Sequence, residues 1–298
     1  MDQNPAMPIA GPTANGTRGA TVLVLASIVS VQLGSALATT LFDEIGAAGA
    51  VLLRAAFGAM VLLALTRGAP LRVRGWPHRD VLLLGVAVAA VNLSFYAALE
   101  RLPLGITVTL EFIGPLGVAI FGSRRWRDVI WVLLAAAGIV LLSDPFGSEG
   151  VDALGVVLAL TAGAFWAAYI VFSDRVGALG PGPGGATMAA VISAILVAPF
   201  GIAQGGAEIL TPSHLLVGAG VGILSTAIPY VFEIEALRRL PRAVFGVLMS
   251  LEPAVAAAIG FLALSQALAP VEVVAIGLVV IASAGALRSA ATLPPRDT

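Results

Sequence analysis

The chain has 298 residues, of which 59% are hydrophobic and only 11% charged, with a net charge of −1 and a mean hydropathy of +1.01. A soluble domain has about 45–50% apolar and about 25% charged residues, so the composition excludes an ordinary soluble fold and fits lipid as the solvent. The near-neutral charge gives no reason to expect a nucleic-acid partner. There is no cysteine for disulfides or thiolate metal sites and no lysine for a GxxxxGK[ST] phosphate loop, so no cofactor is expected.

The N-terminus is mostly polar over residues 1–19, which predicts a disordered segment. The apolar run 21–38 follows and ends in Ala36-Leu37-Ala38, which resembles a signal-peptidase site. A signal peptide has a basic start and a shorter apolar run, so we interpret residues 21–38 as part of a retained first helix.

Apolar stretches of nearly twenty residues then recur along the chain, separated by short polar loops. Each is close to the ~20 residues that cross a bilayer as an α-helix. The predicted spans are 20–41, 45–66, 80–99, 103–122, 127–143, 153–173, 185–203, 214–236, 242–264 and 269–287. The predicted fold is therefore an all-α integral membrane protein with ten transmembrane helices and no room for a soluble catalytic domain.

The arginines orient these helices, because cytoplasmic loops of membrane proteins collect basic residues. Only Arg101 falls in the opposite set of loops, and Arg54 lies inside a span. One set of alternate loops holds the rest: Arg18, Arg67, Arg72, Arg74, Arg79, Arg124, Arg125, Arg127, Arg175, Arg238, Arg239, Arg242, Arg288 and Arg296. Both termini are therefore expected in the cytoplasm, in a multi-pass protein of the plasma (inner) membrane.

The chain also repeats itself. The sequence RLP opens the fourth span at 101–103 and the ninth at 239–241, and Pro115 matches Pro253 at the same offset. The repeat predicts two copies of a five-helix unit. Because five is an odd number of crossings, the two copies insert into the membrane in opposite directions. Inverted repeats are common in secondary transporters, with the substrate site near the midplane. The predicted segments are the cytoplasmic N-terminus 1–19, the repeats 20–143 and 153–288, the extracytoplasmic linker 144–152 and the cytoplasmic tail 289–298.

Charged residues lie where the spans should be apolar. Arg54, Glu111 and Glu252 are central in their spans, and Glu233 lies deep in the eighth. A charge at the centre of a transmembrane helix costs roughly 2.5–3.5 kcal/mol on insertion scales, so such residues normally face the interior and mark a pathway. The alternatives are a structural ion pair for Arg54 with Glu111 or Glu252, and for Glu252 a role in the helix break before Pro253.

Polar and aromatic residues at helical spacing accompany these charges, as with Gln32 and Ser35 in the first span. Packing roles are the alternative for the aromatic residues, and the glycines of GAGVG at 218–222 indicate close helix packing. The predicted substrate-binding residues are Arg54, Asn92, Tyr96, Glu111, Trp166, Tyr169, Thr226, Tyr230, Met249 and Glu252. The predicted proton-coupling residues are Glu111, Glu233 and Glu252.

Several motifs resemble those of one transporter family. PLGI at 103–106 with LEFIGPL at 110–116, and STAIPY at 225–230 with LMSLEP at 248–253, resemble the threonine/homoserine exporter branch of the EamA-like drug/metabolite transporters. The resemblance covers about residues 20–288. It implies ten helices in two inverted repeats and export of small amino acids across the plasma membrane.

The residues themselves are compatible with such a substrate. A zwitterion needs a cation for its carboxylate, which Arg54 can supply, and an acceptor for its ammonium, which Glu111 or Glu252 can supply. No ATP-binding motif is present, so a gradient must drive transport, and exchange for a proton is expected. The alternatives are an exporter of other metabolites or drugs on the same fold, a channel, or an intramembrane enzyme, for which no HExxH or GxSxG motif is found.

Overall fold

The computed structural model describes residues 14–69, 78–122, 129–142, 152–178 and 184–291. These ranges are helical and contain no strand. Within them, three shorter apolar helices, Leu104–Ala119, Val129–Leu141 and Pro270–Ala286, accompany seven that are long and apolar enough to cross a membrane. The seven are Arg18–Thr39, Phe42–Leu65, Arg79–Leu99, Ala153–Gly177, Gly184–Leu210, Pro212–Leu237 and Val244–Leu264. An all-helical membrane protein is confirmed, whereas the number of crossings stays a prediction.

The helices follow the predicted spans closely, with most differences at their ends. In the first part of the chain they are α1 (Ala14–Thr39), α2 (Phe42–Leu65), α4 (His78–Leu99), α5 (Leu104–Glu111), α6 (Ile113–Gly122) and α7 (Val129–Leu142). The second part has α8 (Ala153–Gly177), α9 (Gly184–Gly205), η2 (Gly206–Leu210), α10 (Pro212–Gly222), the π-helical η3 (Ile223–Ala227), α11 (Ile228–Leu237), α12 (Arg242–Met249), α13 (Glu252–Leu264) and α14 (Pro270–Ala291). Helix α1 begins ahead of the predicted start at residue 20. Residues 1–13, most of the predicted linker and residues 292–298 lie outside the described residues.

Three of the spans are interrupted near their middle, each just before a proline. Helix α5 ends at Glu111, ahead of Pro115, and α13 starts at Glu252, ahead of Pro253. The π-helical turn η3 precedes Pro229 in the same way. A proline ring has no N–H and clashes with the preceding turn, which explains why the regular helix gives way at these points. The breaks place two carboxyl groups at helix ends inside the bundle.

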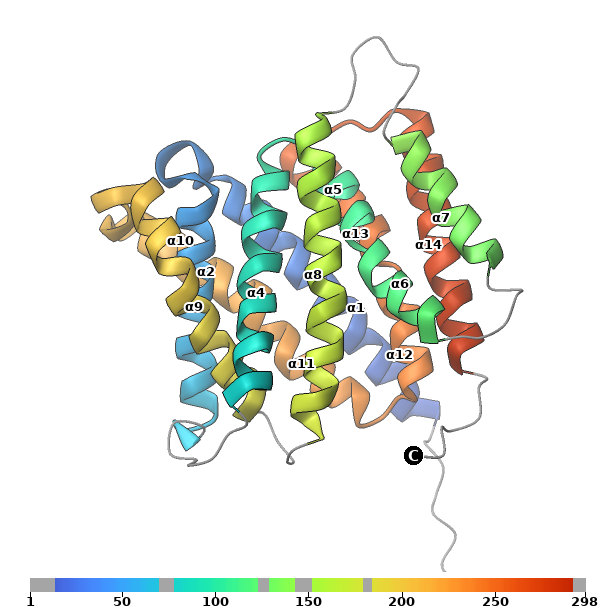
Figure 1. Ribbon diagram of the computed structural model, residues 1–298, viewed down its shortest axis with the longest axis horizontal. Helices are drawn as coiled ribbons and strands as arrows, with labels where there is room; N and C mark the ends of the chain where they lie inside the picture. The colour runs from blue at the N-terminus through green and yellow to red at the C-terminus, as the bar shows by residue number, and fades with distance from the viewer. Residues whose placement is uncertain (1–13, 70–77, 123–128, 143–151, 179–183, 292–298) are drawn as a thin grey trace, which may run out of the picture.

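The two parts of the chain interleave in one bundle. Helix α4 packs along α8, α2 along α9, α5 against α13, and α7 along α14, while α1 packs against α10, η3 and α11. Figure 1 shows α4 and α8 side by side across the front and α7 beside α14 at one edge. Every one of these pairs joins the first part of the chain to the second. The two parts therefore share one interior and are not separate domains.

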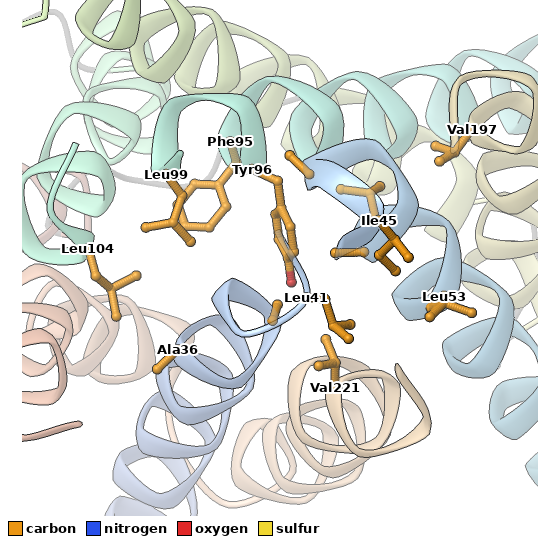
Figure 2. Packing of buried hydrophobic residues seen from close by; sticks show 14 of the residues in the cluster. Ala36, Leu41, Ile45, Leu53, Phe95, Tyr96, Leu99, Leu104, Val197 and Val221 are labelled. Atoms are coloured by element: carbon orange, nitrogen blue, oxygen red, sulfur yellow. The ribbon is translucent and has the colours of Figure 1, made fainter. Parts of the chain in front are cut away.

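A cluster of buried apolar side chains closes one end of this interior (Figure 2). Tyr96 is fully buried in it and contacts the rings of Phe42 and Phe95, with centroid distances of 5.9 and 5.7 Å. We call this group the end cluster. Figure 2 labels its members Ala36, Leu41, Ile45, Leu53, Phe95, Tyr96, Leu99, Leu104, Val197 and Val221. They come from the C-terminal halves of α1, α4 and α9, the turn between α1 and α2, the N-terminal half of α2, the start of α5 and the end of α10, so the cluster adjoins the α1–α2 corner.

Hydrogen bonds tie this same corner to both parts of the chain. Gly46, at φ +69°, breaks the first turn of α2, and the next two backbone N–H groups bind side chains instead of carbonyls. Ala47 N donates to Glu100 Oε1 at 2.8 Å, and Ala48 N donates to Gln204 Oε1 at 2.7 Å. Glu100 follows α4 and Gln204 lies in α9, so both parts of the chain cap α2.

Asp152 makes a further connection at this end, where it caps α8. Its Oδ1 accepts hydrogen bonds from the N–H groups of Leu154 and Gly155, and its Oδ2 accepts one from Arg101 Nη1 at 2.9 Å. The bond from Gly155 N–H, and then the one from Arg101, hold the pKa of Asp152 below its usual value. The single arginine on this side of the predicted topology is thus an ion-pair partner of the α8 N-terminus.

Glycines allow α6 and α8 to cross at backbone contact. A Cβ added to Gly163 would lie 2.6 Å from the carbonyl oxygen of Glu111, and one at Gly114 would overlap the Gly163 carbonyl. We expect Gly163→Ala to destabilise the protein by about 1–3 kcal/mol through overpacking. The measurement is the thermal unfolding midpoint in detergent. Gly277→Ala in α14, where a Cβ meets nothing within 4 Å, is the matched control and should not lower the midpoint. Equal behaviour of the two variants would contradict the close crossing.

Candidate functional site

A cavity of about 350 Å³ lies inside the bundle. Its walls come from the C-terminal halves of α2 and α8, the N-terminal half of α9, the middle of α4 from Leu84 to Phe95, and residues of α1, α5, η3, α11, α12 and α13. It therefore lies on the other side of the end cluster from the α1–α2 corner. The predicted residues in its wall are Arg54, Asn92, Glu111, Trp166, Tyr169, Thr226, Tyr230, Glu233, Met249 and Glu252. Their roles as ligands stay predictions.

Tyr96 is the predicted residue that does not line the cavity. Its side chain points into the end cluster, where Figure 2 shows it projecting toward Leu41 and Val221. It reaches the site indirectly, because its hydroxyl oxygen accepts a hydrogen bond from Arg54 Nη1 at 3.3 Å. The guanidinium carbon of Arg54 also lies 5.5 Å from the Tyr96 ring centroid, within the range of a cation–π interaction. Tyr96 thus positions the Arg54 guanidinium from the side of the end cluster.

Arg54 projects from α2 into the cavity wall with neutral partners. Its Nη2 donates to the carbonyl oxygen of Ser225 at 3.5 Å, a long bond to the π-helical turn η3. Among the described residues no carboxylate oxygen lies within 4.0 Å of its guanidinium nitrogens. The ion pair that the sequence allowed with Glu111 or Glu252 is therefore not formed in this conformation. The guanidinium retains N–H donors for a ligand.

Three carboxyl groups form a row along the cavity. Glu111 and Glu252 are 7% and 6% exposed, and they interact electrostatically with each other. Glu252 also interacts with Glu233, which lies toward the end of α11. Two side chains of α1 hold the row: Ser27 Oγ donates to Glu233 Oε1 at 2.7 Å, and Gln32 Nε2 donates to Glu252 Oε1 at 3.1 Å. The three carboxyl groups therefore extend from the breaks at the end of α5 and the start of α13 to the part of the cavity beside α11.

Other predicted residues complete the wall by packing. Trp166 meets the ring of Phe112 edge-on, with centroids 5.4 Å apart. Thr226 packs against Gly58 of α2, where an added Cβ would lie 2.9 Å from its hydroxyl oxygen. Tyr169 lies close enough to Tyr230 for the two phenols to interact electrostatically. The aromatic side chains therefore shape the cavity on the side formed by α8 and α11.

The binding prediction omitted several polar residues that the structure brings to the wall. These are Gln32, Ser35, Ser173, Ser193 and Ser225. The helical spacing of Gln32 and Ser35 in the first span already indicated a shared face, and this pattern could have predicted both as residues of the wall. Serines within helices carry little information, because they can bond to their own backbone as readily as face a cavity.

Comparison with known proteins gives the class of this chain. Residues 153–288 match the model of the EamA-like transporter family. The chain is also 42% identical over 266 residues to the threonine/homoserine exporter RhtA of Escherichia coli (strain K12), covering 89% of this chain and 90% of that protein. The chain belongs to the EamA-like transporter family. It is a multi-pass plasma-membrane transporter and not an enzyme.

Other relatives narrow the position within the family. The threonine/homoserine exporter RhtA of Salmonella typhimurium (strain LT2) is 41% identical with the same coverage of this chain. The uncharacterized transporter YwfM of Bacillus subtilis (strain 168) is 29% identical, over 76% of this chain and 81% of its own length. The chain therefore lies in the RhtA branch. One solved crystal structure with 22% identity superposes with a TM-score of 0.63, over 90% of this chain and 96% of that one, and shows the same fold.

The chain contains no cysteine, so single cysteines can report on access to the cavity. We expect Ser173→Cys, in the wall at the C-terminal part of α8, to react with a water-soluble maleimide. Ser283→Cys, fully buried on α14 and outside the wall, is the control and should stay unmodified. The measurement is the labelled fraction of each variant by mass spectrometry. Equal labelling of both would contradict the described cavity.

Proposed function

We propose that the chain is a secondary transporter that exports small neutral amino acids, such as threonine or homoserine, across the plasma membrane in exchange for protons. The observation that carries the proposal is the joint presence of unneutralised Arg54 and the buried carboxyls of Glu111 and Glu252 in one cavity wall. The names of the relatives at 41–42% identity support the substrate class.

The chemistry of the wall suits a zwitterion. The Arg54 guanidinium can bind a carboxylate through paired N–H groups, and Glu111 or Glu252 can accept from an ammonium. Burial in a bundle strengthens both interactions, because the effective dielectric constant there is lower than in water. The cavity volume of about 350 Å³ is at the small end of the range for ligand pockets, which fits a substrate of this size.

The proposed topology has ten crossings, two inverted five-helix repeats and cytoplasmic termini. The packing pairs support it, since α2 with α9, α5 with α13, and α7 with α14 each join corresponding helices of the two repeats. The arginine-rich loops then face the cytoplasm. In this orientation the cavity adjoins the cytoplasmic side and the end cluster closes the outside. The conformation described is therefore an inward-facing one.

Proton exchange follows from competition for one carboxylate. A carboxylate that binds the substrate ammonium cannot hold a proton at the same time, so loading one releases the other. Glu252 interacts with both Glu111 and Glu233, and Glu233 lies toward the end of α11 that leads into the arginine-rich loop. We therefore assign Glu233 to proton passage between the cavity mouth and the two deeper acids.

The first test is counterflow of threonine and homoserine in proteoliposomes. We expect saturable exchange by the wild type, and a loss of at least about tenfold for Arg54→Ala, because a buried charge-assisted bond to the substrate carboxylate is removed. Arg288→Ala, at the exposed end of α14, should retain wild-type exchange. Exchange of other metabolites or dyes, but of neither amino acid, would replace the proposed substrate class.

The second test addresses the proton. We expect Glu111→Gln to abolish the stimulation of threonine transport by an imposed pH gradient, because an amide cannot gain and lose a proton in this range. Threonine counterflow without a gradient should survive to a greater extent than gradient-driven flux. The measurement is the ratio of the two fluxes, with folding followed by size-exclusion chromatography. An unchanged ratio would remove Glu111 from the coupling mechanism.

A further inference from the structure

Five buried oxygen atoms of the cavity wall have no hydrogen-bond partner among the described residues, and three of them are the hydroxyl oxygens of Ser193, Ser225 and Tyr230. The other two are Gln32 Oε1 and Glu252 Oε2, on adjoining side chains that are 2% and 6% exposed. Both residues line the cavity. A buried polar atom without a partner is uncommon and destabilising, which makes a pair of them at one place a sign of a missing ligand.

The two atoms belong to one locked pair. Gln32 Nε2 donates to Glu252 Oε1 at 3.1 Å, so the amide and the carboxyl face each other. This bond consumes one oxygen of the carboxyl and leaves the other free, while the amide oxygen of Gln32 is also left free. The remaining capacity of the pair is therefore two acceptor oxygens and the second N–H of the Gln32 amide. The chemical group that complements it is one rich in N–H donors.

We propose that Gln32 and Glu252 together form the ammonium-binding subsite, and that Gln32 is a ligand that selects substrates with a primary amine. This assignment rests on the proposed function, since it concerns how the same cavity holds an amino acid. An ammonium has three N–H groups, of which the Gln32 amide oxygen and the Glu252 carboxylate take two. Glu252 is then the carboxylate at which the ammonium and the proton compete, and Glu111 stays free to exchange protons with it.

The position of Arg54 agrees with this assignment. Arg54 interacts electrostatically with Glu252, yet the two form no ion pair within 4.0 Å among the described residues. An α-amino acid carries its carboxylate and its ammonium on a single carbon atom. It can therefore bridge a guanidinium and a carboxylate that lie near each other without touching.

The closing experiment compares two ligands in the wild type and in Gln32→Met, which keeps the length of the side chain and removes its acceptor. The ligands are L-threonine and 2,3-dihydroxybutanoate, in which a hydroxyl replaces the amine. Binding to the purified protein is measured by isothermal titration calorimetry. The wild type should prefer threonine, and Gln32→Met should reduce this preference by about ten- to a hundredfold, the loss of one hydrogen bond to a charged group. Leu33→Met, at the neighbouring position of α1 but exposed and outside the wall, should keep the wild-type preference.

The outcomes separate the two proposals. If the wild type binds neither threonine nor homoserine, the proposed function fails. If it binds threonine but Gln32→Met weakens both ligands equally or changes neither, the proposed function stands and Gln32 is not an ammonium ligand. The ligand comparison in the wild type does not depend on the folding of a variant. Equal affinity for threonine and its hydroxy analogue there would overturn the subsite by itself.

Discussion

The arrangement of this transporter depends on keeping a guanidinium inside an apolar bundle without neutralising it. Arg54 is held by the hydroxyl and ring of Tyr96 and by the carbonyl of Ser225, all of which are neutral. A carboxylate in direct contact would neutralise the guanidinium and take the paired N–H groups that could otherwise bind a ligand. The end cluster fixes Tyr96, and the π-helical turn before Pro229 presents the carbonyl. The packing of one end of the bundle thus positions the charge at the centre.

The helix breaks coincide with two acids of the cavity wall. Glu111 ends α5 and Glu252 begins α13, so each lies where the regular pattern stops, and the close crossing of Gly114 and Gly163 brings α8 against the first break. The two breaks meet, because α5 packs on α13. Pro115 and Pro253 occupy matching places in the two halves, and the breaks beside them bring both acids to the contact between α5 and α13.

Much of this could be predicted from the sequence, since lipid imposes simple rules. Hydropathy located the helices, and the cost of charge in a membrane identified Arg54, Glu111 and Glu252 as residues that face the interior. Side-chain direction could not be obtained in this way. Tyr96 was predicted to bind substrate together with Asn92, but its side chain turns into the end cluster. The bond between Gln32 and Glu252 joins residues 220 positions apart, and no local pattern reports such a contact.

The glycine corner of α2 has a consequence for motion. Two backbone N–H groups that have no helical partner there bind side chains from different halves of the chain: Ala47 N–H binds Glu100, and Ala48 N–H binds Gln204. The bond to Gln204 is exposed, so water can replace it at little cost, whereas the bond to Glu100 is partly buried. If the closed end parts, the corner should stay with the first half of the chain and detach from the second. Such a hinge would open reversibly, with water replacing the broken hydrogen bond. The rate of opening would then depend on Gln204, a surface residue outside the cavity wall.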